Sequence, residues 1–262
     1  MKIYGGKNMG SDMQQLELHR SFLKDFIRLE IDFSQTAQSR GLAAPPLQKP
    51  VPENAELFEL PEPVAALKET CSLSLSECVM NRESVRKYSD KPLTMQELSA
   101  LLYATQGVKK TVNKSTATRT VPSGGSRHAF ETYLSVDHVE GLEPGLYRYL
   151  PFDQKILLIR KDAEIGQKAA VACMGQLFVA KAAVTFFWTA IPERMEWRYG
   201  LASHKVIAID SGHVCQNLYL ACTAMKAGTC AIAAYSQNEC DKLLEVDGTD
   251  EFTIYIAPVG KF

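Results

Sequence analysis

The sequence predicts a layered α+β domain built around one sheet. Segments typical of helices and of strands follow one another without a regular β–α–β alternation, which favours this class. The apolar run AAVTFFWTA predicts a strand buried on both faces, and the amphipathic pattern at about 203–227 predicts the most regular helix. The 262 residues, 46% of them hydrophobic, supply a core for one domain of catalytic size with an extension.

Charge and cysteine content argue against several classes of protein. The 29 basic and 30 acidic residues form no long run of one sign, so neither nucleic acid nor an anionic membrane surface is an expected partner. The sequence has no apolar signal-peptide core and no stretch of the roughly 18 apolar residues that span a membrane. The seven cysteines are odd in number and form no C-x-x-C. We therefore expect a soluble, cytoplasmic protein with reduced thiols.

Residues 1–62 are predicted to form an N-terminal extension, and residues 63–262 the folded domain. A helix is expected at about 16–29, followed by the arm RGLAAPPLQKPVPENAELFELPEP, in which proline forbids a long helix or a central strand. The arm is expected to lie across the body or a second subunit; the alternative is a flexible linker. Its apolar anchors would be Leu42, Leu47, Val51, Leu57 and Phe58.

The first half of the domain carries several local signals. A helix is predicted through SLSECVMNR, and a capping box from Thr94 to Glu97 starts a second helix that ends at Gly107. Residues 108–127 are interpreted as a polar loop. A strand is predicted in AFETYLSVDHV, and two more in GLYRYLPFDQKILLIR.

The second half begins with a predicted helix at about 163–181. The buried strand and the most regular helix follow, and that helix stops at Gly228. The chain then finishes with the short apolar run TCAIAAY, a helix in NECDKLLEV and a strand in FTIYIAPVG.

The stretch NRESVRKYSD places Arg82, Ser84 and Arg86 at alternate positions. In an extended backbone these side chains share a side, and about 3.3 Å per residue separates the two arginines by roughly 13 Å. This is comparable to flavin mononucleotide (FMN), measured from its phosphate towards its ring. Guanidinium groups bind phosphate or a ring carbonyl, and a serine hydroxyl suits a ribityl or phosphate oxygen. Taken alone, the spacing also fits a solvated charged strand.

A second segment, RTVPSGGSRHAFETY, precedes a predicted strand. Pro122 fixes φ, while Gly124 and Gly125 allow backbone amides to approach a ligand; an ordinary turn is the alternative. Together, R-x-S-x-R-x-Y followed by P-S-x-G-x-R-H-x-x-E-x-Y resembles the nitroreductase superfamily of flavin enzymes. The resemblance is closest to the SagB-type branch, which includes azoline dehydrogenases. It extends from about residue 40 through YATQG, GLYRY, EWRYG, GHVCQNLYLACTAMKAGTCAI and IAPVGK.

This resemblance implies a nitroreductase-like three-layer domain, with a central mainly antiparallel sheet flanked by helices. It also implies a homodimer with FMN at the subunit interface. Arg82, Ser84 and Arg86 would hold the phosphate and ribityl chain. The segment with Pro122, Ser123, Gly124 and Ser126 would reach the flavin from the other subunit.

The resemblance implies three further contacts with FMN. The backbone of Ala231, Ile232, Ala233 and Ala234 would pass the reactive edge of the ring, where small side chains permit close approach. Gln176 would donate to a ring carbonyl near the pyrimidine, or it is simply a surface glutamine. Lys261, in the terminal P-V-G-K, would help to neutralise the phosphate.

The pair Arg198 and Tyr199 departs from the azoline dehydrogenases, which carry a Lys-Tyr pair there for substrate deprotonation. Arginine cannot act as a base near neutral pH, because its pKa stays above about 12. Tyr199 would hand on a proton, and Arg198 would bind an anionic substrate or stabilise negative charge. A surface arginine beside a core tyrosine is the structural alternative.

The function implied is hydride transfer through flavin N5, with NAD(P)H-linked reduction of small nitro, quinone or related acceptors. One alternative is a SagB-type dehydrogenase that oxidises azoline heterocycles in modified peptides. A second alternative is a non-catalytic flavin-binding docking protein. The sequence contains no dinucleotide-binding glycine motif, P-loop or metal-ligand spacing that would favour another chemistry.

Overall fold

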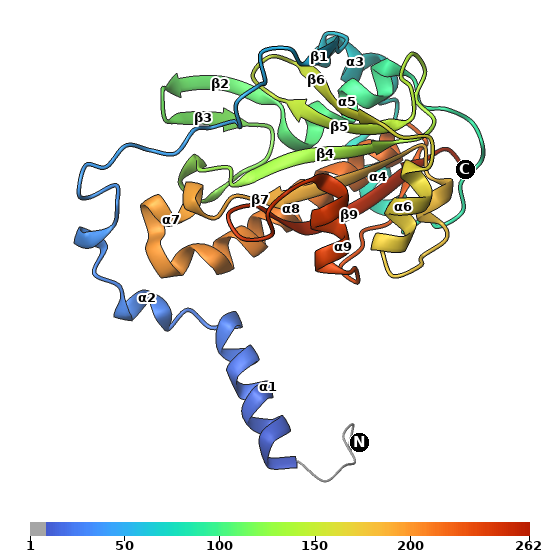
Figure 1. Ribbon diagram of the computed structural model, residues 1–262. Helices are drawn as coiled ribbons and strands as arrows, with labels where there is room; N and C mark the ends of the chain where they lie inside the picture. Colours follow the sequence, from blue (N-terminus) through green and yellow to red (C-terminus); the bar gives the residue numbers. More distant parts are fainter. Residues whose placement is uncertain (1–8) are drawn as a thin grey trace.

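A seven-stranded sheet forms the middle of the molecule in the computed structural model, which describes residues 9–262 (Figure 1). The strand order is β1-β6-β5-β4-β7-β9-β8, and all neighbouring strands are antiparallel. The strands are β1 (Glu56–Glu59), β4 (Phe130–Val136), β5 (Gly145–Leu150), β6 (Lys155–Lys161), β7 (Val184–Ala190), β8 (Gly228–Thr229) and β9 (Phe252–Gly260).

Helices cover both faces of this sheet and make three layers. All seven residues of β7 are buried, and Phe186 and Trp188 face the core formed with α5 and α8. Phe187, between them, faces the core formed with α6 and α9. The predicted three-layer α+β fold and its doubly buried strand are therefore confirmed. The domain helices are α3 (Pro63–Thr70), α4 (Leu75–Asn81), α5 (Met95–Gln106), α6 (Ile165–Ala172), α7 (Glu193–Tyr199), α8 (Ser203–Ala224) and α9 (Gln237–Leu244).

The prediction of a polar loop at residues 108–127 is wrong. Its first part forms a two-stranded hairpin of β2 (Val108–Asn113) and β3 (Thr116–Arg119). The Asn113 side chain closes the turn by accepting a hydrogen bond of 2.9 Å from the backbone N–H of Ser115. β2 is largely exposed and its sequence is mostly polar, so it resembled a loop. Its β-branched threonine and valine residues, which favour a strand, were therefore overlooked.

Two predicted helices have different limits in the structure. The helix expected at 163–181 ends at Ala172, because Met174 and Gly175 take left-handed backbone angles with φ of 58° and 75°. A separate 3₁₀ turn, η3 (Val179–Lys181), follows. The helix expected at 16–29 is two helices, α1 (Met9–Leu23) and α2 (Ile27–Glu30). Between them the Lys24 N–H bonds to Ser21 O, three residues back, rather than continuing the α-helical pattern.

The proline-rich arm lies along the body, where backbone hydrogen bonds hold it. The N–H of Gln38 donates to Trp197 O at 2.8 Å, and the Trp197 indole donates to Leu42 O at 2.9 Å. Buried arginines then bind the carbonyls of Leu47 and Pro50. The predicted anchors Leu42 and Leu57 are 52% and 41% exposed, so neither side chain is buried against this chain's own body; near Leu42 the polar backbone makes the contact.

The extension ends in β1, which pairs with β6 at the edge of the sheet. Upstream of the arm, α1 stands away from the sheet (Figure 1). All seven cysteines are free, in line with the expected thiols. Within residues 9–262 no helix combines the length and apolar character needed to cross a membrane.

Candidate functional site

The first motif leaves α4 in an extended conformation beside α8. Ser84 forms a parallel bridge with Thr229 of β8, and the Val85 N–H donates to Thr229 O at 3.0 Å. On the other side, the Arg82 guanidinium lies 5.3 Å from the ring centroid of Tyr219. The Ser84 Oγ lies 2.9 Å from the Tyr219 hydroxyl. The side chains at 82 and 84 therefore face the same helix, as the alternation predicts.

Two hollows of about 660 and 650 Å³ flank this motif. The first is lined by Arg82, Tyr219 and Lys226, and the second by Ser84 and Arg86. Arg86 is exposed to solvent. The cationic side chains of one extended stretch thus border adjoining spaces large enough for a phosphorylated ligand.

The segment after β8 presents backbone amides. The Ala231 N–H donates to the Tyr219 hydroxyl at 2.8 Å, and the Ile232 N–H donates to Ile256 O at 2.8 Å. Ala233 and Ala234 are exposed, and neither amide N–H has a hydrogen-bond acceptor within the part of the chain that the structure describes. These two donors are therefore available to a ligand.

Gln176 lies beside this segment. Its side-chain amide donates to the carbonyls of Ala234 and Cys173, each at 2.9 Å. Both amide hydrogens are thus used within the protein. A donation to a flavin carbonyl, as the resemblance implies, would require one of these bonds to break.

Lys261 lies close to the end of the first motif, because its carbonyl accepts a hydrogen bond from the Ser89 N–H. Its ammonium group is paired with the carboxylate of Glu97 on α5, and both side chains are largely buried. Glu97 also completes the capping box with Thr94. The positive charge of Lys261 is therefore balanced within the chain.

The P-S-G-G turn packs against α7 and α8. The Gly124 N–H donates to Asp210 Oδ2 at 3.1 Å. A Cβ on Gly125 would lie 2.7 Å from the Tyr199 hydroxyl and 2.8 Å from Arg198, and its φ of 58° favours glycine. The structure thus brings the predicted turn together with Arg198 and Tyr199.

The remaining predicted residues of this turn serve mainly to shape it. Ser123 Oγ accepts a hydrogen bond of 3.0 Å from the His128 N–H, and the Ser126 N–H donates to Ser123 O. Ser126 has a φ of 53°, and Pro122 precedes the turn. These bonds fix the loop conformation within one chain.

Several arginine side chains lie near this second cluster. The Arg198 guanidinium lies 5.6 Å from the Tyr199 ring centroid, and Arg127 lies 4.7 Å from that of Trp197. Burial lowers the pKa of Arg127, and the charges of Arg198 and Arg194 lower it further. Burial also raises the pKa of the Asp210 carboxyl, although the hydrogen bonds that it accepts from the turn oppose this effect. An anionic group would be stabilised beside Arg198.

The two clusters contact opposite halves of α8. The turn contacts this helix at Asp210, and the first motif contacts it at Tyr219, nine residues further on. At 1.5 Å per residue, these contacts are about 14 Å apart along the helix axis. Within one chain, the turn and the first motif therefore do not form a single compact site.

His128, next to the turn, predicts a pH dependence of stability. Burial, followed by the charge of Arg119, lowers its pKa from 6.5 to about 3. As pH falls below 6.5, the unfolded chain takes up a proton that the folded chain does not, so stability is lost between pH 6.5 and 3. At about 1.4 kcal/mol per pH unit, the loss from pH 6.5 to 5 is about 2 kcal/mol.

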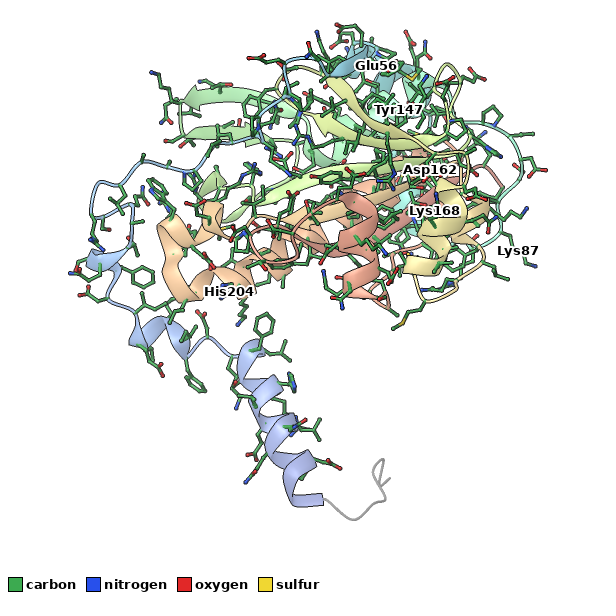
Figure 2. The ribbon with its side chains drawn as sticks, in the orientation of Figure 1. Glu56, Lys87, Tyr147, Asp162, Lys168 and His204 are labelled. Atoms are coloured by element: carbon green, nitrogen blue, oxygen red, sulfur yellow. The ribbon has the colours of Figure 1, made fainter. Side chains whose placement is uncertain are left out.

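This pH dependence is testable by urea unfolding at several pH values. We expect His128→Asn to remove about 2 kcal/mol of the loss between pH 7 and 5, since asparagine tolerates the φ of 45° at this position. The control is His204→Asn, because that side chain is half exposed (Figure 2). Equal pH slopes for the wild type and His128→Asn would show that His128 does not cause the effect.

Tyr219 and Asp210 contact the predicted residues but were not predicted themselves. Both lie in the helix recognised from its amphipathic pattern, and Tyr219 stands between Leu218 and Leu220. An apolar pattern does not predict which residue a hydroxyl group on the helix will hydrogen-bond. The only available signal was the polar atom of a tyrosine within a mostly apolar helix segment, which usually finds a partner when buried.

Comparison with known proteins identifies the family. The model of the Nitroreductase family matches residues 79–261. A protein of Methanocaldococcus jannaschii, "Putative nitroreductase MJ1384", is 34% identical over 189 residues, covering 72% of this chain and 91% of the relative. The residues that the family model matches include both motifs and the 231–234 segment.

Two solved structures share the fold. A "putative nitroreductase" from Anabaena variabilis has a TM-score of 0.64 at 23% identity, covering 82% of this chain but only 45% of its own. One from Ralstonia eutropha has a TM-score of 0.64 at 24% identity, covering 84% of this chain and 98% of its own. The family match, the related sequence and the shared fold agree: the chain belongs to the nitroreductase family, whose members are oxidoreductases that generally use flavin cofactors.

Proposed function

We propose that this protein is an FMN-dependent oxidoreductase that uses NAD(P)H to reduce small nitro, quinone or related acceptors. The observation that carries the proposal is the arrangement around the C-terminal half of α8. Arg82 and Ser84 contact this half of the helix through Tyr219, and Ala231 contacts it through the same hydroxyl. Arg86 and the free amides of Ala233 and Ala234 adjoin these residues in the sequence.

The residues present fit FMN. Arg82, Ser84 and Arg86 supply cations and a hydroxyl for a phosphate, next to hollows of sufficient size. Ala233 and Ala234 supply N–H donors, and their small side chains permit a flat ring to approach closely. When bound, FMN supplies hydride transfer; the protein's part is to bind it, orient it and exclude water.

A homodimer would complete the site. Because the P-S-G-G turn lies about 14 Å from the first motif along α8, two antiparallel copies of this helix would bring the turn of one chain near the motif of the other. The exposed face of α8 suits such a contact. Ile209 is 51% exposed, and a Cβ on Gly212 would meet nothing within 4 Å.

Arg198 and Tyr199 would then act on the acceptor. The guanidinium group would stabilise negative charge, and the tyrosine hydroxyl would donate a proton. An azoline dehydrogenase would instead need a base at this place, which Arg198 cannot provide. Arg198 beside the turn favours acceptors that are anionic or that gain negative charge on reduction.

Flavin spectroscopy tests this proposal. The full chain should bind added FMN, NADH or NADPH should bleach the visible absorbance, and a nitroaromatic or quinone should restore it. Failure to bind FMN would contradict the proposal as a whole. Binding without reduction by either nicotinamide would remove the reductase function and leave the dehydrogenase or docking alternatives.

A further inference from the structure

Tyr219 touches three of the predicted cofactor contacts at once. Its ring lies 5.3 Å from the Arg82 guanidinium, and its hydroxyl lies 2.9 Å from Ser84 Oγ and 2.8 Å from the Ala231 nitrogen. It also lines the cavity of about 660 Å³ together with Arg82. One side chain of α8 thus joins two segments that lie almost 150 residues apart in the sequence.

The chemistry of the three groups gives these hydrogen bonds a direction. A backbone N–H can only donate, so the Tyr219 oxygen accepts from Ala231. Either hydroxyl of the Tyr219–Ser84 pair could donate, and donation by the tyrosine is the direction that suits an oxygen already accepting from Ala231. This leaves the Ser84 O–H free to donate to a ligand. Such a chain runs from amide to phenol to serine, and each bond polarises the next.

We propose that Tyr219 is a positioning residue, whose hydroxyl directs the Ser84 O–H toward an anionic oxygen of the bound ligand. The same hydroxyl occupies the Ala231 N–H and holds the following backbone in place, with the amides of Ala233 and Ala234 unpaired. The aromatic ring supports Arg82 through a cation–π contact. The inference rests on the proposed FMN site, because that site supplies the anionic oxygen.

The test is a double-mutant cycle between Tyr219 and Ser84, with FMN affinity measured by fluorescence titration. Tyr219→Phe keeps the ring beneath Arg82 and removes only the hydroxyl, so we expect about tenfold weaker binding. Ser84→Ala should weaken binding by a similar factor. Because Tyr219 acts partly through Ser84, the loss of affinity caused by Tyr219→Phe should be smaller in the Ser84→Ala background than in the wild type.

A matched control separates positioning from general loss of structure. Tyr147 on β5 (Figure 2) also bonds a backbone group through its hydroxyl, in this case by donating to the Glu143 carbonyl at 2.8 Å. Tyr147→Phe should leave FMN affinity unchanged. The thermal melting temperatures of the two flavin-free variants should differ from that of the wild type by similar amounts.

The outcomes distinguish this inference from the proposed function. Wild-type affinity in Tyr219→Phe, or losses that multiply in the double variant, would overturn the role of Tyr219 while the FMN site stands. No binding of FMN by the wild-type chain would overturn both.

Discussion

Arg86→Glu should weaken FMN binding by at least about 100-fold. Arg86 is exposed and lines a hollow with Ser84, so its charge is available to a phosphate. The substitution removes a guanidinium fork and places a carboxylate beside a group that carries nearly two negative charges. The measurement is a titration that follows quenching of FMN fluorescence, at about 0.15 M salt to screen distant charges.

Lys91→Glu provides the matched control. It makes the same change of net charge at an exposed position five residues further on, outside that hollow. We expect less than about a threefold effect, since an exposed charge beyond the Debye length is largely screened. Undiminished affinity in Arg86→Glu would place the phosphate elsewhere. Lys226, which lines the cavity of about 660 Å³, would then be the next cation to test.

Local signals in the sequence predicted much of the fold. The capping box formed by Thr94 and Glu97 is present, and α5 begins directly after Thr94. The apolar strand β7 is buried throughout, and α8 forms where a helix was predicted, although Ile209, which the pattern placed on its apolar face, is 51% exposed. Each of these features depends on residues that are neighbours in the sequence, so sequence pattern alone suffices to recognise it.

The predictions of the fold were wrong where strands were polar, or where backbone conformation ended a helix within a segment of helical composition. The β2–β3 hairpin consists of polar residues on exposed strands, so no apolar alternation marked it. The early end of α6 depends on left-handed angles at Met174 and Gly175, within a segment of otherwise helical composition. Such turns depend on backbone angles that residue type only partly determines.

The candidate site could be predicted only in part, because some of its contacts join residues far apart in the sequence. The motif around Arg82 and the turn around Gly124 are local patterns, so the sequence alone indicated them as candidates. The contacts of Tyr219 with Ser84 and of Lys261 with Glu97 join residues 135 and 164 positions apart. Nothing in either local segment specifies the partner, so only the folded chain reveals that Lys261 is already paired.

A buried ion pair beneath the arm predicts the largest loss of stability. Glu131 Oε1 accepts hydrogen bonds from Arg194 at 2.5 Å and from the Lys49 N–H at 2.9 Å, and the two charged side chains are only 2% and 3% exposed. Glu131→Leu would leave the Arg194 charge buried without compensation. We expect the free energy of unfolding to fall by about 3–5 kcal/mol, measured by urea unfolding.

The exposed pair of Glu59 and Lys155 is the matched control. Glu59 also lies on a strand of the sheet, but its side chain is 76% exposed. Glu59→Leu should therefore change the free energy of unfolding by less than about 1 kcal/mol. If Glu59→Leu and Glu131→Leu lowered the free energy of unfolding equally, burial of the unpaired Arg194 charge would not be the cause of the loss.

The double variant Glu131→Leu with Arg194→Met separates the ion pair from packing. If Glu131→Leu lowers the free energy of unfolding because a buried charge is left unpaired, replacing Arg194 as well should recover most of that free energy. Two apolar side chains avoid the desolvation of both ions. Arg194 belongs to α7, which also carries Arg198 and Tyr199 against the P-S-G-G turn. Glu131→Leu should therefore also weaken FMN binding, and affinity should return together with stability in the double variant. Restored stability without restored affinity would instead show that the ion pair orients α7 for binding.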